Sequence, residues 1–226
     1  MISVIIPTLN EAEYLEATLR SIRKNDTPHE IIVVDGHSED STEDIARSHG
    51  AKVSLSHRQQ RAYQQHQGAQ KANGSLLLFL HADTILGARS LGDMDSKMRR
   101  SVFVGGAFSR RFEHPSRALI LTSWLADWRV RILGLALGDQ GIFVRTKIYE
   151  QLGGFSDLDI FEDLEFSQRL RQAGRLTLVT PPIRSSGRRF GQRPLYRSIR
   201  DGIATIRFLS RIRRSSRSLG VPCKEP

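Results

Sequence analysis

The sequence has 226 residues, of which 39% are hydrophobic and 26% charged, a composition that indicates a globular chain rather than a fibrous or disordered one. Its single cysteine, Cys223, excludes an internal disulfide and a cysteine-built zinc site. The net charge of +10 favours anionic partners, and because no apolar run approaches the roughly 20 uncharged residues that cross a bilayer, we expect a cytoplasmic protein.

Four short apolar runs alternate with helix-like segments over the first eighty residues. The runs are Ser3–Pro7, Ile31–Val34, Ala51–Leu55 and Ser75–Leu80. Asn10, with Glu13 three residues later, is the expected N-cap of the first helix. Apolar runs without strict alternation, joined by helices, are typical of a parallel sheet covered on both faces. We therefore predict an α/β fold with a Rossmann-like, mostly parallel sheet flanked by helices.

The second half of the chain is less regular. Val104–Phe112 and Gly141–Arg145 are predicted strands, and Ala118–Val130 is a predicted amphipathic helix. A further helix is expected over Leu164–Gln172, and Leu176–Val179 followed by two prolines is expected to close the compact part. The composition changes near residue 184, since residues 184–217 contain eleven arginines and one acid. Such a stretch can contact nucleic acid, a membrane or an acidic substrate, or form a solvated helix face.

Polar and acidic residues directly follow three of the apolar runs. Thr8 and Glu11 follow the first, Asp35 follows the second, and His81 and Asp83 follow the fourth. In open α/β sheets, ligands bind at the carboxyl ends of the strands, near the point where the strand order reverses. Because buried charges need partners, these carboxylates are not expected in the core. The pattern predicts a ligand site at this edge of the sheet.

Each acidic position allows a chemical and a structural interpretation. Asp83 can supply a hard oxygen ligand to a divalent cation that bridges phosphates, or it can cap a turn. Asp35 can accept hydrogen bonds from a nucleobase or ribose hydroxyl, or close a turn with its own backbone. Glu162-Asp163 can supply a base that takes a proton from a hydroxyl, although acids are also common in the first turn of any helix.

Four segments together resemble glycosyltransferase family 2. They are SVIIPTLNE, IIVVDGHSEDST, LLLFLHAD and FEDLEFSQRLRQAG, in that order, and the likeness is to a small bacterial subgroup with HAD in the metal-binding place. The resemblance covers about residues 1–191. It implies a GT-A fold, a nucleotide-sugar donor with a UDP-sugar as first candidate, Mg²⁺ or Mn²⁺ as cofactor, and inversion at the anomeric carbon.

The resemblance also implies roles for individual residues. Asp83 matches the last acid of the D-x-D metal motif, Asp163 matches the catalytic base, and Arg61 matches a donor-contacting arginine. The positions that cradle the nucleoside are matched by Pro7, Thr8, Glu11 and Asp35. His81, which we place with the donor-binding residues, replaces the first acid of D-x-D and leaves the choice of metal open.

The same resemblance suggests how the chain is divided. Residues 1–190 would form the GT-A domain, with a nucleotide-binding half over 1–83 and a smaller acceptor-side half over 84–190. Residues 191–226 would form a basic helical extension. The polymerase signature Q-x-x-R-W is absent, its nearest counterpart being Arg188-Arg189-Phe190, so we expect transfer of a single sugar.

The acceptor is not encoded in a recognisable motif. Leu119–Leu137 and the arginine-rich C-terminus can form a surface for an anionic membrane, with Trp124 and Trp128 as interfacial anchors. A lipid or lipid-linked acceptor would then be expected, and the protein would lie peripherally at the inner face of the membrane. The alternative is an ordinary amphipathic helix packed on the sheet, followed by a solvated tail.

Two other classes of function compete with a transferase of sugars. A nucleotidyltransferase would normally carry a glycine-rich, basic loop after the first strand, and PTLNEAEYL has neither feature. A nucleic-acid-binding protein that uses the arginines would leave Asp35, Asp83 and Asp163 without a role, so no nucleic-acid partner is expected. A non-catalytic protein that binds sugar nucleotides fits the same motifs.

Overall fold

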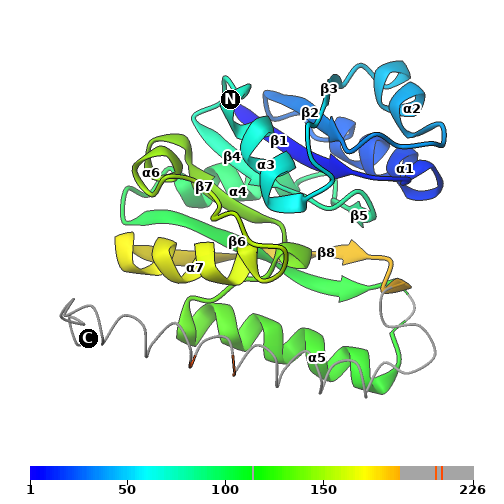
Figure 1. The fold of residues 1–226 in the computed structure, drawn as a ribbon. Coiled ribbons are helices and arrows are strands. Elements are labelled where there is room, and N and C mark those ends of the chain that lie inside the picture. Colours follow the sequence, from blue (N-terminus) through cyan, green and yellow to red (C-terminus); the bar gives the residue numbers. More distant parts are fainter. Residues whose placement is uncertain (114, 189–206, 208–209, 211–226) are drawn as a thin grey trace.

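The computed structural model describes residues 1–113, 115–188, 207 and 210. The predicted extension over residues 191–226 therefore lies outside the described residues, apart from 207 and 210. The described residues form an eight-stranded sheet with the order β3-β2-β1-β4-β7-β6-β8-β5, covered by helices (Figure 1). The predicted α/β fold with a mostly parallel sheet is confirmed.

The first half of the chain builds the parallel side of the sheet. Strand β1 pairs in parallel with β2 and with β4, and β2 pairs in parallel with β3. The elements are β1 (Ile2–Thr8), α1 (Ala12–Arg23), β2 (His29–Asp35), α2 (Thr42–Ser48), β3 (Lys52–Leu55), α3 (Arg61–Gln70) and β4 (Leu76–Phe79). All four apolar runs are strands, as predicted.

The second half adds an antiparallel step and a second parallel pair. Strand β7 lies antiparallel between β4 and β6, whereas β6 runs parallel to β8 and the short β5 closes the edge. The elements are β5 (Thr84–Ile85), α4 (Ser90–Met98), β6 (Phe103–Phe112), α5 (Arg117–Trp128), a π-helical turn η1 (Arg129–Leu133), a 3-10 turn η2 (Gly138–Gln140), β7 (Ile142–Arg145), α6 (Thr146–Gln151), α7 (Glu162–Ala173) and β8 (Arg175–Ser185). Figure 1 shows α5 lying beneath β6 and β8.

Two apolar cores lie on opposite faces of the sheet. Val4 and Ile6 of β1 belong to the core that contains the buried faces of α1 and α4, while Ile5 between them belongs to the core under α3, α6 and α7. This alternation follows from the two-residue period of a strand. A sheet that is apolar on both faces explains why the runs in β1, β2 and β4 show no polar alternation.

Strand β8 is longer than predicted, because it continues through Pro181 and Pro182 to Ser185. The register with β6 shifts between Phe108 and Arg110, opposite these prolines, and pairing resumes at Ile183. Proline lacks an N–H and is therefore tolerated at an irregularity, where no ladder hydrogen bond is lost. The two prolines therefore lie inside the strand, three residues before its end at Ser185, rather than after it.

Glu30 joins the amino ends of the first strands. Its carboxylate accepts from Ser3 Oγ at 2.5 Å, Lys52 Nζ at 2.7 Å and Asn73 N at 2.6 Å, and thus ties β1, β2, β3 and the segment before β4. Burial alone would raise the pKa of Glu30, but the donors from Lys52, Ser3 and Asn73 outweigh it and lower the pKa to about 2.

We predict that Glu30→Gln lowers the free energy of unfolding at pH 7 by about 2 kcal/mol, the scale of charge-assisted hydrogen bonds. Because the folded-state pKa is depressed, this contribution is present above the unfolded value near 4.5 and is lost as the pH falls toward 2. Urea unfolding of both proteins between pH 7 and 3 measures it. The control is Glu43→Gln, which removes an exposed pair with Arg47. A constant difference at every pH would contradict the prediction.

Candidate functional site

The carboxyl ends of β1, β2 and β4 meet at one edge of the sheet. Strand order reverses at β1, which lies between β2 and β4, so this edge is the switch point at which α/β sheets bind ligands. Thr8 and Asp35 are register partners at the ends of β1 and β2, and Pro7 precedes them opposite Val34. The structure therefore brings Pro7, Thr8 and Asp35 together, as the sequence predicts.

Asp35 is buried, contrary to the expectation that these acids lie outside the core, because neighbouring donors pair both of its carboxylate oxygens. Its Oδ1 accepts from Thr8 Oγ1 at 2.9 Å and from Ser38 Oγ at 2.6 Å, and its Oδ2 accepts from Ser38 N at 2.7 Å. Gln64 of α3 donates from Nε2 to the carbonyls of Thr8 and Val34, at 2.8 Å each. These contacts hold the two strand ends and α3 as one rigid unit.

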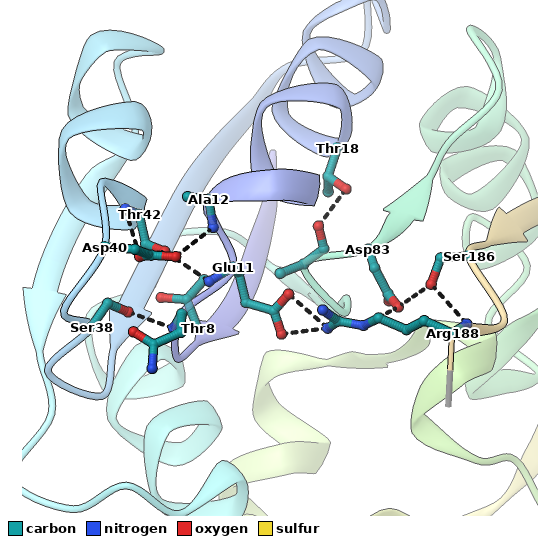
Figure 2. A network of polar contacts seen from close by, with 12 residues as sticks. Thr8, Glu11, Ala12, Thr18, Ser38, Asp40, Thr42, Asp83, Ser186 and Arg188 are labelled. Atoms are coloured by element: carbon teal, nitrogen blue, oxygen red, sulfur yellow. Dashed lines mark hydrogen bonds and ion pairs between the residues drawn. The ribbon is translucent and has the colours of Figure 1, made fainter. Parts of the chain in front are cut away.

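The loop after β2 supplies the cap of helix α1 (Figure 2). Glu11 N donates to Thr42 Oγ1 at 2.8 Å, and Ala12 N donates to Asp40 Oδ2 at 3.1 Å. The predicted N-cap, Asn10, instead has a φ of 54° and accepts from Glu39 N with its side-chain oxygen. The prediction was wrong because the capping partners come from a loop about thirty residues away in sequence.

Glu11 and Asp83 lie on either side of one guanidinium. Arg188 Nη2 lies 2.5 Å and 2.6 Å from the two carboxylate oxygens of Glu11, and its Nε lies 3.2 Å from Asp83 Oδ2 (Figure 2). Ser186 Oγ also donates to Asp83 Oδ2 at 2.6 Å. The two predicted site acids, Glu11 and Asp83, are therefore brought together, and the carboxylate of each is already paired with Arg188.

His81 and Asp163 converge on Gly138 in turn η2. Gly138 N donates to Asp163 Oδ2 at 2.6 Å, and Leu164 N donates to Asp163 Oδ1 at 2.7 Å. A Cβ added at Gly138 would lie 2.8 Å from His81 Nε2 and 3.2 Å from Asp163 Oδ2, so the glycine allows the two side chains to approach. His81 thus faces the acid of α7.

His81 is neutral at physiological pH. Burial lowers the pKa of the imidazole, the nearby Arg61 lowers it further, and together they outweigh three neighbouring acids to give a value of about 4. Its Nε2 is buried and has no hydrogen-bond partner among the residues that the structure describes. Since buried polar atoms are normally paired, this nitrogen is available to a ligand.

Arg61 is paired with the acid that precedes Asp163. Its Nη1 lies 3.4 Å from Glu162 Oε1, and Glu162 is only 3% exposed. Burial raises the pKa of Glu162, as does the adjacent Asp163, while Arg61 lowers it. The pair connects α3 with α7, and Arg61 also lies near enough to His81, after the end of β4, to affect its pKa.

A divalent cation fits the chemistry of the Glu11–Asp83 pair. Two carboxylates already flank a positive group there, and a cation that also binds phosphates and water needs only one or two protein ligands. Within the described ranges, no cluster of three or more His, Cys, Asp or Glu side chains is arranged to hold a metal alone. Any ion at this edge would therefore complete its shell with a ligand.

Three residues of the site were not among the predicted site residues, although one of them, Arg188, belongs to the segment that is nearest to Q-x-x-R-W. They are Gly138, Ser186 and Arg188, which act through contacts with Asp163, Asp83 and Glu11. A glycine beside an aspartate and an arginine in a basic stretch are too common to be selected without the fold. The register of β8 with β5, which pairs Thr84 with Ser185, brings Ser186 and Arg188 to Asp83.

Comparison with known proteins adds a family and a set of structural neighbours. The family model described as Glycosyl transferase family 2 matches residues 3–139 and so ends before Asp163. A PGL/p-HBAD biosynthesis glycosyltransferase of Mycobacterium bovis (strain BCG / Pasteur 1173P2) is 39% identical over 112 residues, which cover 46% of this chain and 42% of the relative. Glycosyltransferase AglE of Haloferax volcanii is 33% identical over 91 residues, covering 36% and 30%. The chain thus spans under half the length of the curated relatives it matches.

Solved structures share the fold at low sequence identity. S. aureus TarS 1-349 superposes with a TM-score of 0.68 at 18% identity, covering 91% of this chain and 65% of that one. The mannosyltransferase PcManGT from Pyrobaculum calidifontis, solved with GDP-Man and Mn²⁺, gives 0.64 at 20% identity, covering 82% and 56%.

Proposed function

The chain belongs to glycosyl transferase family 2 and has the GT-A fold, and on that premise we propose that it transfers a single sugar from a nucleotide-sugar donor to an acceptor, with inversion and with a divalent cation. The proposal rests mainly on one observation: three sets of polar residues lie close together at the carboxyl edge of the sheet. These groups are the Thr8–Asp35 pair, the Glu11–Asp83 pair and Asp163 beside Gly138.

The donor would bind along the ends of β1, β2 and β4. Asp35, held by Thr8 and Ser38, offers carboxylate oxygens to the nucleoside, and residues 1–83 would form this donor half. Relatives support a nucleotide sugar, since TarS 1-349 is solved with UDP-GlcNAc and PcManGT with GDP-Man and Mn²⁺. A UDP-sugar is our first candidate for this chain.

Asp83, with Glu11 beside it, would hold Mg²⁺ or Mn²⁺. When bound, such an ion offsets the charge that develops on the departing nucleoside diphosphate. Asp163 would accept the proton of the acceptor hydroxyl, and the two backbone N–H donors that orient its carboxylate fix the direction of that transfer. The neutral His81 leaves Nε2 free to hydrogen-bond a hydroxyl beside this base. Residues 84–190 would supply this acceptor side.

The acceptor side also presents an apolar surface that suits a membrane. Helix α5 and turn η1 expose seven large apolar side chains on successive turns: Ile120, Leu121, Trp124, Leu125, Trp128, Ile132 and Leu133. Arg117 and Arg131 are exposed on the same segment, and its one acid, Asp127, is buried in an ion pair with Arg111. Apolar and cationic groups without exposed acids are typical of segments that lie on anionic bilayers.

We propose that this α5–η1 face contacts an anionic membrane and that the acceptor is a lipid or is lipid-linked. Turn η2, which holds Asp163 through Gly138, follows η1 after four residues, so the surface and the proposed base belong to one continuous segment. In the described residues, no helix is long and apolar enough to cross a bilayer. The contact would therefore be peripheral.

A donor screen tests the central proposal. Thermal unfolding is recorded with UDP-, GDP- and dTDP-sugars, with and without Mn²⁺. We expect one donor to raise the melting temperature only when the metal is present, because a ligand that binds only the folded state stabilises it. Asp83→Ala should abolish the metal-dependent rise in melting temperature. Equal stabilisation of Asp83→Ala and wild type by donor and Mn²⁺ would contradict the assignment of Asp83.

Asp163→Asn tests the base. We expect donor binding to persist, because Asp163 lies on the acceptor side, while the rate of transfer falls by about 10²-fold or more, the usual contribution of a general base. Donor affinity by calorimetry and transfer by release of nucleoside diphosphate separate the two effects. Asp157→Asn, on an exposed acid of the preceding loop, is the control. Undiminished transfer by Asp163→Asn would exclude it as the base.

Vesicle binding tests the membrane contact, and the chain carries its own probe. Trp124 and Trp128 are its only two tryptophans, so their emission reports on the α5–η1 face alone. We expect vesicles containing anionic phospholipid to blue-shift this emission at low salt, and neutral vesicles to do so much less.

A double substitution provides the matched comparison. Trp124→Ala with Trp128→Ala should reduce co-sedimentation with anionic vesicles, whereas Ile160→Ala, which removes an even more exposed apolar side chain elsewhere, should not. Unchanged emission with anionic vesicles at low salt would count against a membrane-facing role for α5.

A further inference from the structure

Arg188 occupies the position between the two acids that the proposed function assigns to a divalent cation. Its guanidinium forms a two-oxygen contact with Glu11 and reaches Asp83 through Nε at 3.2 Å. The side chains of Glu11 and Asp83 are only 16% and 12% exposed, and that of Arg188 is 41% exposed. With the positive group in place, the carboxylate pair is largely shielded from water.

The placement of Arg188 is determined by the fold and by several side-chain contacts. Ser186 N donates to Asp83 O at 3.3 Å, continuing the β5–β8 pairing, and Arg188 N donates to Ser186 Oγ at 3.3 Å. The guanidinium lies over the ring of Tyr14, with its carbon 4.6 Å from the ring centroid. A planar guanidinium is well suited to this combination of carboxylate pairing and ring stacking.

A metal ion and this guanidinium require the same carboxylates. Arg188 and a divalent cation are both positive, so they repel one another strongly at this distance, and each gains from the charge of Glu11 and Asp83. An ion that binds Asp83 would also need the oxygen to which Ser186 and Arg188 now donate. Binding of the ion and retention of the arginine bridge are therefore mutually exclusive.

We propose that Arg188 is a built-in competitor of the divalent cation: it bridges Glu11 and Asp83 in the donor-free chain and must leave them before a metal can bind. The inference rests on the proposed function only in taking these acids as the metal site. In this proposal, Arg188 lowers the affinity of the site for the metal ion until a bound donor supplies further ligands to that ion. By linkage, the free energy with which the arginine bridge stabilises the donor-free state is lost from the free energy of metal binding.

The test measures Mn²⁺ alone, without donor or acceptor, on the full chain. Binding of Mn²⁺ to wild type and to Arg188→Ala is followed by the electron paramagnetic resonance signal of the free ion. We expect Arg188→Ala to bind Mn²⁺ about tenfold more tightly, the effect of removing one well-formed, partly shielded ion pair. Arg188→Lys, which keeps the charge but loses the planar fork, should lie between the two.

Arg184→Ala is the matched control, because it removes an exposed arginine of β8 from the same segment. It should bind Mn²⁺ as wild type does. Thermal unfolding without metal verifies that each variant is folded, and saturating Mn²⁺ should raise the melting temperature of Arg188→Ala more than that of wild type.

Arg188→Ala binding Mn²⁺ no more tightly than wild type, including no measurable binding to either protein, would overturn the proposal. An equal gain in Arg184→Ala would overturn it as well, since the effect would then be one of net charge. A failure of sugar transfer leaves this result untouched, because no step of the metal titration depends on a donor or on turnover.

Discussion

A carboxylate that is removed from water must be paired, and at the carboxyl edge of this sheet each acid finds its donor on another segment. Asp35 is held by Thr8 and Ser38, Asp83 by Ser186 and Arg188, and Asp163 by the backbone of Gly138. Unpaired, these charges would cost several kcal/mol each. The pairing of these acids therefore determines how the loops fold over the carboxyl edge of the sheet. It also determines which carboxylate oxygens a ligand can reach.

This constraint explains which parts of the fold the sequence predicts. Strands β1, β2 and β4 are predictable, because a strand buried on both faces must be apolar throughout, and that is a local property. The end of β8 was predicted wrongly. Proline normally ends a strand because it lacks an N–H for the ladder, but the register shift between β8 and β6 at the two prolines means that no ladder hydrogen bond is lost there. Asn10 failed as a cap for a similar reason, since its helix is capped by Asp40 and Thr42.

The residues of the candidate site likewise fall into those that the sequence predicts and those that only the fold reveals. Thr8, Asp35 and Asp83 are found by their position after apolar runs, since the ends of neighbouring parallel strands necessarily meet. Arg188 belongs only to a distant counterpart of Q-x-x-R-W, and nothing in the sequence pairs it with Glu11, which lies 177 residues away. Ion pairs of this range follow from strand register, which only the assembled sheet defines. Motif matching thus finds Glu11 and Asp83 but not the arginine that lies between them.

The histidine in the HAD segment acquires a clearer interpretation from its surroundings. An aspartate in place of His81 would lie beside Asp139 and Asp163, with Arg110 already paired to Asp139. It would be a fourth acid beside Asp83, Asp139 and Asp163, with Arg61 and Arg110 as nearby cations, whereas a neutral imidazole adds no charge and still offers a nitrogen toward Gly138. His81 therefore belongs by position to the acceptor side as much as to the donor side. If Asp83 and Glu11 hold the cation, the neutral histidine adds no further negative charge beside Asp163, and it lies within electrostatic reach of both Asp83 and Asp163.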